Sequence, residues 1–322
     1  MKAIIFDGNL KYLTDYPIPA PRENEALMRV RLAGICNTDM EILRGYLGFH
    51  GVVGHEFTGV VEKAPEPASA LIGKRVVGEI NCGCCECDFC RTGLERHCPD
   101  RTTLGILGRD GAFADYVALP VANLRPVPDS VSDVEAVFTE PLAAAFEITE
   151  QAHIRPTEEV LVLGDGKLGL LCSFVLDLTG AHVTLAGRHA TKLNLAANRG
   201  IDTVCVSMEA LSEKRRFDVV VEATGSIEGF ETALKHTRPR GRIVLKSTVA
   251  GTQSMNLAPL VIDEITLVGS RCGSFGPALR ALTQKHIDVT PLVSGIYAFE
   301  HAREAFEKAQ EKESLKTLID FR

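Results

Sequence analysis

Several features that mark other protein classes are missing from this sequence. No apolar run is long enough to cross a membrane, and residues 1–12 lack the basic start and apolar centre of a secretion signal. Positive charge is scarce: the formal net charge is -7 at pH 7, whereas general binding to nucleic acid or to an anionic membrane needs a basic surface. We therefore expect a cytoplasmic protein that acts on small molecules and binds neither nucleic acid nor membranes.

Long low-complexity segments and internal repeats are also absent. The chain has 322 residues, of which 45% are hydrophobic and 24% charged, so it is globular and long enough for two domains. Helical periodicity is nearly absent before residue 130, which predicts an irregular, β-rich first domain. The strands expected there are residues 1–6, 26–32, 57–62, 75–79 and 113–119.

The pattern changes after residue 129. Residues 132–138 and 141–151 have helical character, and we place the boundary of the first domain near Glu140. The expected organisation is a β domain over 1–140, a nucleotide-binding domain over 141–271 and a tail over 272–322 that returns to the first domain. Its expected segments are residues 277–285 and 300–311 and a final strand at 315–321.

The middle of the chain reads as a strand, a glycine-rich turn and a helix. Residues 164–169, GDGKLG, fit G-x-G-x-x-G between an apolar run and a helical period. The glycines permit a tight turn, approach of backbone N–H groups to a pyrophosphate, and close packing of helix on strand. Five strand-like runs follow, at 182–186, 203–206, 218–222, 242–246 and 265–269. This order predicts an α/β Rossmann domain with a doubly wound parallel sheet, and it disfavours the alternative of a glycine turn that binds no nucleotide.

The end of the second strand of this unit bears on the coenzyme. NAD enzymes place an acid there on the ribose 2′-hydroxyl, but this chain has Gly187, so we expect no carboxylate to repel a 2′-phosphate. Arg188 follows, with His189 and Lys192 nearby, and a guanidinium suits phosphate. We predict a preference for NADP over NAD; the alternative is a solvated Arg188 and no preference. The other residues assigned to the coenzyme are Gly164, Gly166, Lys167, Leu168, Gly169 and Thr224.

Cysteines crowd into one segment, residues 81–98, NCGCCECDFCRTGLERHC. The spacing C-x2-C-x2-C-x7-C lets a loop offer four thiolates to one structural zinc. The cysteines in that spacing are Cys84, Cys87, Cys90 and Cys98. Cys82 and Cys85 are left over, so other sets of four can be drawn. Free thiols, an iron–sulfur cluster and a redox pair are the alternatives to zinc.

Three further motifs lie far apart in the chain: GICNTD with Cys36, GHEF with His55 and Glu56, and TEPLA with Glu140. Each alone has a structural explanation, as a core thiol, a turn histidine or a helix-capping acid. Together they supply one cysteine, one histidine and carboxylates, the ligand set of a catalytic zinc that keeps one position open.

These motifs, the cysteine segment and the glycine loop resemble the zinc-containing medium-chain dehydrogenase/reductase superfamily, close to alcohol, sorbitol and threonine dehydrogenases. The resemblance covers the whole chain. It implies a partly open, GroES-like β domain with two zinc ions per chain, a Rossmann domain, and assembly into dimers or tetramers. It also implies that Cys36, His55 and Glu140 bind the catalytic zinc, with Glu56 as an alternate or direct ligand.

The same resemblance implies roles for neighbouring residues. Asp39 would accept a hydrogen bond from the ring of His55 and so orient it toward the metal. The Thr38 hydroxyl would contact the substrate alcohol and pass its proton outward. Many relatives continue this relay with a histidine where this chain has Glu41. Lys316 stands where relatives place a basic residue near the pyrophosphate, and a solvated lysine is the alternative.

We therefore expect a zinc-dependent, NAD(P)-linked alcohol dehydrogenase that oxidises a secondary alcohol or polyol to the carbonyl. One alternative is a carbonyl reductase, which runs the same chemistry backwards. Another, from a different class, is a non-catalytic regulator that binds zinc and a dinucleotide. A regulator would not need the complete set of Cys36, Thr38, His55 and Glu140.

Overall fold

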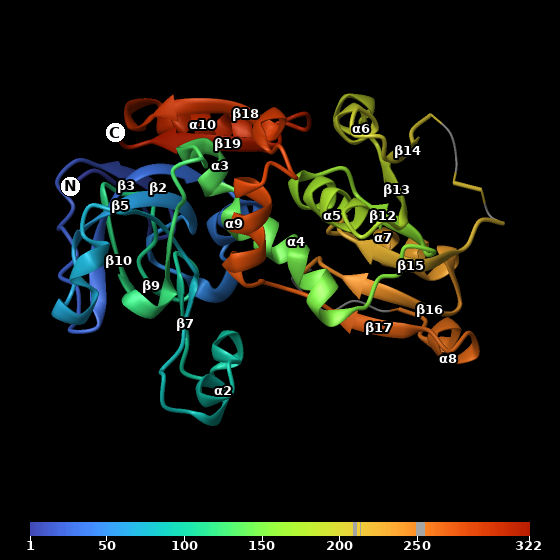
Figure 1. The fold of residues 1–322 in the computed structure, drawn as a ribbon. Helices are drawn as coiled ribbons and strands as arrows, with labels where there is room; N and C mark the ends of the chain where they lie inside the picture. The colour runs from blue at the N-terminus through green and yellow to red at the C-terminus, as the bar shows by residue number, and fades with distance from the viewer. Residues whose placement is uncertain (209–210, 213, 249–254) are drawn as a thin grey trace. The chain divides into compact units, whose positions relative to one another are not determined.

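The computed structural model describes residues 1–208, 211–212, 214–248 and 255–322. These form two compact units, which Figure 1 shows coloured along the chain. The first unit comprises Met1–Glu140 and Phe275–Arg322, and the second comprises Pro141–Ser274. The chain thus leaves the first unit at Glu140 and comes back to it at Phe275.

A seven-stranded sheet organises the first unit, with the order β11-β6-β5-β3-β19-β18 and with β10 also paired to β3. Its strands are β3 (Glu25–Gly34), β5 (Glu56–Lys63), β6 (Arg75–Gly78), β10 (Tyr116–Pro120), β11 (Leu124–Pro126), β18 (Val293–Ala298) and β19 (Lys316–Asp320). β3 pairs antiparallel with both β5 and β19, so the last strand of the chain completes the sheet of the first unit.

Two small sheets and several short helices complete this unit. The small sheets are β2-β1-β4, with β1 (Ala3–Phe6), β2 (Leu10–Leu13) and β4 (Gly51–Val52), and β7-β8-β9, with β7 (Asn81–Cys82), β8 (Thr102–Leu104) and β9 (Gly108–Arg109). The α-helices are α1 (Asn37–Leu43), α2 (Asp88–Arg91), α3 (Asp133–Val137), α9 (Phe275–Thr283) and α10 (Ala302–Gln310). The 3-10 helices are η1 (Tyr46–Gly48), η2 (Glu66–Leu71), η3 (Glu95–His97), η4 (Val121–Asn123), η5 (Thr290–Leu292) and η6 (Phe299–His301). Helices α1 and α2 lie in the region expected to lack helix, because segments this short show no hydrophobic period.

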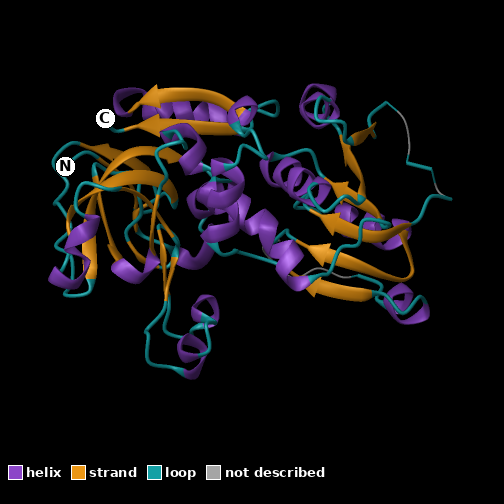
Figure 2. Ribbon diagram, viewed as in Figure 1, coloured by secondary structure: helices purple, strands orange, loops and turns teal. Residues whose placement is uncertain are grey.

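The second unit holds a six-stranded sheet with the order β14-β13-β12-β15-β16-β17, and every neighbouring pair is parallel. Its strands are β12 (Glu159–Leu163), β13 (His182–Gly187), β14 (Asp202–Cys205), β15 (Phe217–Glu222), β16 (Thr237–Leu245) and β17 (Thr266–Gly269). Helices pack beside them (Figure 2), namely α4 (Thr139–Gln151), α5 (Lys167–Asp177), α6 (Ala190–Ala197), α7 (Ile227–His236) and α8 (Ala258–Ile262). The strand order reverses between β12 and β15, and ligands of such sheets bind at the carboxyl ends of the strands beside that reversal. The predicted Rossmann fold is confirmed.

Continuous apolar runs explain why these strands are central. Leu161, Leu163, Val220 and Ile243 are buried in one cluster, as expected for parallel strands covered on both faces. No helix in the described part of the chain combines the length and the hydrophobicity needed to cross a membrane.

Candidate functional site

Cys36, His55 and Glu56 come together because β3 and β5 are antiparallel neighbours. β3 ends at Gly34, which pairs with Glu56 at the start of β5, so residues just beyond the end of β3 face residues at the start of β5. The ligand atoms of Cys36, His55 and Glu56 all lie within 4.8 Å of one another. Sheet pairing therefore joins two motifs that are separate in the sequence.

Asp39 in α1 holds two of these residues at once. Its Oδ2 accepts the backbone N–H of Cys36 at 2.8 Å, and its Oδ1 lies 3.2 Å from Nδ1 of His55. With Nδ1 turned toward Asp39, Nε2 is the atom of His55 that is left for a metal. Burial lowers the pKa of His55, but the charges of Asp39 and Cys36 raise it well above its ordinary value.

Lys316 lies on the other side of Glu56. Its Nζ donates a hydrogen bond to Oε2 of Glu56, and both side chains are only 1% exposed. Burial lowers the pKa of Lys316, but the charges of Glu56 and Cys36 raise it above the ordinary value, so the ammonium stays charged. The alternative of a solvated lysine does not hold for Lys316, because its ammonium is buried against a carboxylate, and its place near a coenzyme pyrophosphate stays a prediction.

Gly34 leaves room for this ion pair. A Cβ at this position would lie 2.8 Å from Oε2 of Glu56 and 3.2 Å from Cδ of Lys316. Contacts that short are repulsive, so a side chain at Gly34 would push the two charged groups apart.

A divalent metal fits the cluster chemically. Oε1 of Glu56 is buried without a hydrogen-bond partner among the described residues, and an unmatched buried carboxylate oxygen is costly. Sulfur, nitrogen and oxygen donors from Cys36, His55 and Glu56 are the ligand types that zinc takes. The negative charge of Glu140 contributes to the raised pKa of Lys316, after the larger effects of burial, Glu56 and Cys36, but Glu140 does not join the group of three ligand atoms found in the described chain.

Thr38 follows Cys36 in the first turn of α1. Its Oγ1 lies 3.7 Å from Sγ of Cys36, and the side chain is half-buried. Farther along the helix, Oε1 of Glu41 accepts a hydrogen bond from Nη1 of Arg44 at 2.6 Å. The Thr38 hydroxyl thus lies beside the metal-binding group. The Glu41 carboxylate, which stands where many relatives have a histidine, accepts a hydrogen bond from Arg44.

The cysteine segment between β7 and β8 forms a second metal-binding group. The four sulfur atoms that lie within 4.8 Å of one another belong to Cys84, Cys87, Cys90 and Cys98. The backbone N–H groups of Glu86 and Cys87 point at Sγ of Cys84 and lower its pKa to about 7. Burial raises the pKa of Cys82 to about 11, and Cys85 is exposed. Both leftover cysteines lie outside the group, so one set of four remains.

The glycine loop joins β12 to α5. Gly164 has φ of 109°, a conformation that glycine adopts without strain. A Cβ on Gly169 would lie 1.8 Å from the carbonyl oxygen of Gly164, so only glycine lets the helix approach the loop. A Cβ on Gly166 would meet nothing within 4 Å. This open side of the loop, next to Lys167 and Leu168 at the start of α5, suits a phosphate at a helix N-terminus.

Thr224 borders the same loop from the end of β15. A Cβ on Gly164 would lie 3.2 Å from Cα of Thr224. The Thr224 hydroxyl donates to Oε1 of Glu222 at 2.6 Å. The two central strands thus present the glycine loop and Thr224 at one edge of the sheet.

Asp165 was missed by the sequence analysis, although it is the second residue of the G-x-G turn. Its Oδ2 accepts the backbone N–H groups of Arg188 at 2.8 Å and His189 at 2.6 Å, and it lies 3.0 Å from Nδ1 of His189. A Cβ on Gly187 would lie 2.4 Å from Cβ of Asp165. The expectation of no carboxylate at the end of β13 is therefore wrong, because the glycine loop itself supplies one.

Two of the residues predicted to bring positive charge to a 2′-phosphate, Arg188 and Lys192, differ in exposure. Arg188 is exposed, and its backbone carbonyl accepts the Ser207 hydroxyl at 2.9 Å. Lys192 is buried within α6, only 7% exposed, and so does not stand in solvent beside Arg188.

The chain matches known proteins along nearly its whole length. Residues 22–129 match the family model of the alcohol dehydrogenase GroES-like domain, and residues 168–287 match that of the zinc-binding dehydrogenases. An Aspergillus clavatus protein named as a probable D-xylulose reductase A is 30% identical, over 95% of this chain and 92% of that protein. The L-threonine 3-dehydrogenase of Edwardsiella ictaluri is 29% identical, over 96% of both chains.

Among solved structures, a zinc-binding dehydrogenase from Sinorhizobium meliloti 1021 with NADP bound aligns with a TM-score of 0.91 at 26% identity. The alignment covers 99% of this chain and 98% of that one. Together with the two groups of metal-binding side chains, these matches show that the chain belongs to the zinc-containing medium-chain dehydrogenase/reductase superfamily, as an NAD(P)-dependent alcohol or polyol dehydrogenase.

Proposed function

We propose that this enzyme oxidises a secondary alcohol or polyol to the carbonyl compound at a zinc held by Cys36, His55 and a carboxylate. The observation that carries the proposal is the meeting of three ligand atoms within 4.8 Å, with the Thr38 hydroxyl 3.7 Å from the cysteine sulfur. Glu56 is the carboxylate in this group, and Glu140 is the alternative. A second zinc belongs to the four cysteines between β7 and β8, giving two per chain.

Each residue of the metal-binding group and its surroundings has its own role in the proposed reaction. When bound, zinc supplies Lewis-acid chemistry that lowers the pKa of an alcohol hydroxyl. Thr38 takes the hydroxyl proton and passes it outward, because its Oγ1 is the hydroxyl beside the ligand group. A nicotinamide coenzyme, which the glycine loop at residues 164–169 would hold, would accept a hydride from the carbinol carbon, so that loss of proton and hydride together would leave the carbonyl. Asp39 holds His55 and Cys36 in position throughout.

We propose NADP as the preferred coenzyme. The exposed guanidinium of Arg188 at the end of β13 suits a 2′-phosphate. Asp165 opposes it with a negative charge, but two backbone N–H groups and the His189 ring already face that carboxylate oxygen. We therefore expect the charge of Arg188 to affect binding of the 2′-phosphate more than the charge of Asp165.

We also propose a homodimer or homotetramer in the cytoplasm. β17 is an edge strand of its sheet, and the neighbouring α8 exposes apolar side chains, with Val261 78% and Ile262 77% exposed. The clustered cysteines need a reducing compartment to stay as metal-binding thiolates. Sedimentation analysis tests the assembly, and a monomer at micromolar concentration would contradict it.

A coenzyme-reduction screen tests the function. Purified enzyme is mixed with secondary alcohols and polyols, with NADP or NAD, and the absorbance of reduced nicotinamide is followed. We expect oxidation of at least one polyol or secondary alcohol. Carbonyl reduction that exceeds oxidation at the same neutral pH would favour the reductase, and zinc-loaded protein inactive in both directions would favour the regulator.

A further inference from the structure

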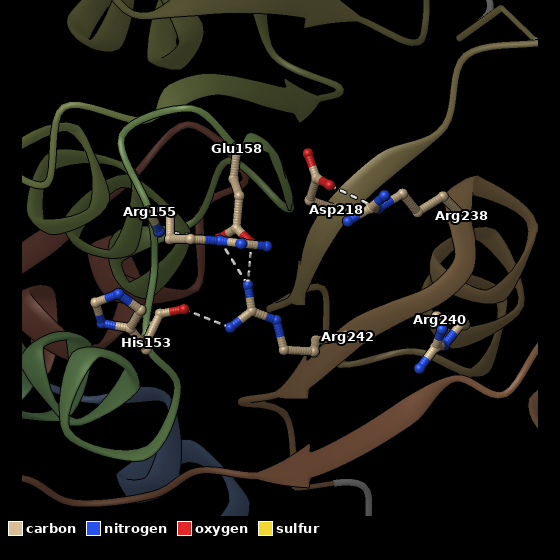
Figure 3. Close-up of a pocket in the computed structure, with 7 residues that line it drawn as sticks. All are labelled: His153, Arg155, Glu158, Asp218, Arg238, Arg240 and Arg242. Atoms are coloured by element: carbon tan, nitrogen blue, oxygen red, sulfur yellow. Dashed lines mark hydrogen bonds and ion pairs between the residues drawn. The ribbon is translucent and has the colours of Figure 1, made fainter.

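A cavity rich in arginine lies in the second unit, outside the residues used by the proposed reaction. Its volume is about 230 Å³, and Figure 3 shows its side chains gathered from the segment before β12, from β15 and from β16. These are the amino ends of the strands. Because β12 is five residues long and rises about 3.3 Å per residue, the glycine loop at its other end is roughly 16 Å away. The cavity is therefore not part of the coenzyme site.

An irregularity in β16 creates the arginine cluster. Phe217 and Val219 of β15 pair with Thr237 and Arg242 of β16, so β16 carries extra residues between the two pairs. Three of the residues from 238 to 242 are arginines that line the cavity. Arg240 adopts φ of 59°, which is strained for a residue other than glycine. Bulges and strained residues of this kind concentrate at functional sites.

The cavity carries more positive than negative charge. Nη2 of Arg242 donates to both oxygens of the buried Glu158 at 2.6 Å, and Arg155 donates to the same carboxylate at 3.1 and 3.2 Å. Nε of Arg238 lies 2.6 Å from Oδ1 of Asp218. Two carboxylates, those of Glu158 and Asp218, thus pair with the guanidiniums of Arg155, Arg238 and Arg242.

Arg240 is the fourth guanidinium. Its ion pair is with Glu264 at 3.5 Å, on the surface, where the two side chains are 83% and 72% exposed. Exposed pairs of this length contribute little. With Glu264 counted, four guanidiniums face three carboxylates, which leaves an excess of one positive charge here, in a chain whose net charge is -7.

We propose that this cavity is a binding site for the phosphate group of a small molecule. An excess of positive charge favours an anion, and a phosphate or phosphate monoester carries about 1.5 to 2 negative charges at neutral pH and at least three acceptor oxygens, more of both than a monocarboxylate. Arginine presents a planar fork of N–H donors to such oxygens. Arg238 uses only Nε in its ion pair, which leaves its two Nη groups to donate, and Arg240 adds its own.

The test is a phosphate titration of the enzyme with coenzyme at saturation, so that the coenzyme site is already filled. Inorganic phosphate and glycerol phosphate are compared with chloride and acetate at equal ionic strength, by calorimetry and by the shift in Tm. We expect both phosphates to bind and raise Tm, and neither chloride nor acetate to do so. Tighter binding of the ester identifies an organic phosphate as the ligand, and equal binding identifies the free ion.

Two variants assign the binding to the cavity. Arg240→Gly removes one guanidinium and also relieves the strained φ, so the unliganded protein should unfold at the same or a higher temperature while phosphate affinity falls at least tenfold. Arg238→Gln should weaken phosphate similarly. Arg199→Ala, which removes an arginine of the same unit elsewhere, should leave it unchanged.

The proposal is overturned if phosphate acts no differently from chloride. It is equally overturned if Arg240→Gly and Arg238→Gln bind phosphate as the native enzyme does, or if Arg199→Ala loses binding to the same extent. Alcohol oxidation is measured on the same samples, so failure of the cavity is distinguished from failure of the proposed reaction.

Discussion

The proposed proton acceptor is a single hydroxyl, that of Thr38. Thr38→Val keeps the size of the side chain and removes the hydroxyl, so we expect turnover of alcohol oxidation to fall by about 100-fold, the scale of a positioned proton-transfer group. Thr38→Ser should keep most of the activity. Steady-state kinetics of the three proteins check this, and a valine variant as fast as the native enzyme would show that water or Glu41 carries the proton.

Lys316 is a buried cation whose partner is Glu56. Lys316→Met leaves that carboxylate buried without its ion pair, so in metal-free protein we expect the free energy of unfolding to fall by about 3–5 kcal/mol. Urea unfolding measures it. The double variant Lys316→Met with Glu56→Gln removes both charges and should recover part of the loss. If the single variant is as stable as the native protein, the buried pair does not stabilise the first unit.

In the proposed preference for NADP, Arg188 and Asp165 are expected to act in opposite directions. A charge-assisted contact contributes about 1.5–3 kcal/mol, so Arg188→Ala should lower kcat/KM for NADP by roughly 10- to 150-fold and change NAD little. Asp165→Asn removes the opposing charge and should raise kcat/KM for NADP relative to NAD. A native enzyme that favours NAD, or an Arg188→Ala variant that weakens both coenzymes equally, contradicts the assignment.

Among the elements, the cysteine segment between β7 and β8 is the one that we propose is held by a structural zinc. Cys98 is fully buried, and its loss should remove the structural zinc at a cost on the order of 4 kcal/mol, as losses of a metal do. Cys85→Ser is the matched control, because Cys85 is exposed and lies outside the group of four, so it should change stability by less than about 0.5 kcal/mol. Thermal unfolding with zinc analysis checks both. Equal effects of the two substitutions would mean that the wrong cysteines are assigned.

The central strands of the Rossmann sheet, β12, β13 and β15, could be predicted from sequence because each contains an apolar run. β16 was predicted too short, since its first residues are the polar bulge that includes Arg238 and Arg240. α1 was missed because seven residues are too few for a helical period. Local pattern thus predicts regular elements and fails where a segment is short or irregular.

The residues of the candidate site show the same contrast between local pattern and tertiary packing. The four-cysteine group could be predicted from its spacing because all four residues lie in one short segment of the chain. Lys316 and Glu56 are 260 residues apart, and only the pairing of β19 with β3 brings them together. Asp165 meets Arg188 through the packing of the glycine loop on β13, which no sequence spacing reports. Contacts made by tertiary packing were therefore the part that sequence could not predict.

We propose that the whole molecule carries two metal sites with different roles. The four-cysteine group should hold its zinc for stability, whereas the group of Cys36, His55 and Glu56 should hold an exchangeable zinc needed for activity. Burial lowers the pKa of His55, but the charges of Asp39 and Cys36 raise it well above its ordinary value. A proton therefore competes with the metal for Nε2 of His55, so the affinity for added zinc should fall as the pH falls.

The most direct test measures zinc content and alcohol-dependent coenzyme reduction on the same sample, before mild chelation, after it, and after zinc is added back. We expect two zinc ions per chain at the start. Chelation should leave one zinc, a folded protein and no activity, and added zinc should restore both the second ion and the activity. Full activity after the exchangeable zinc is gone, or an active preparation with fewer than two zinc ions per chain from the start, would contradict this proposal.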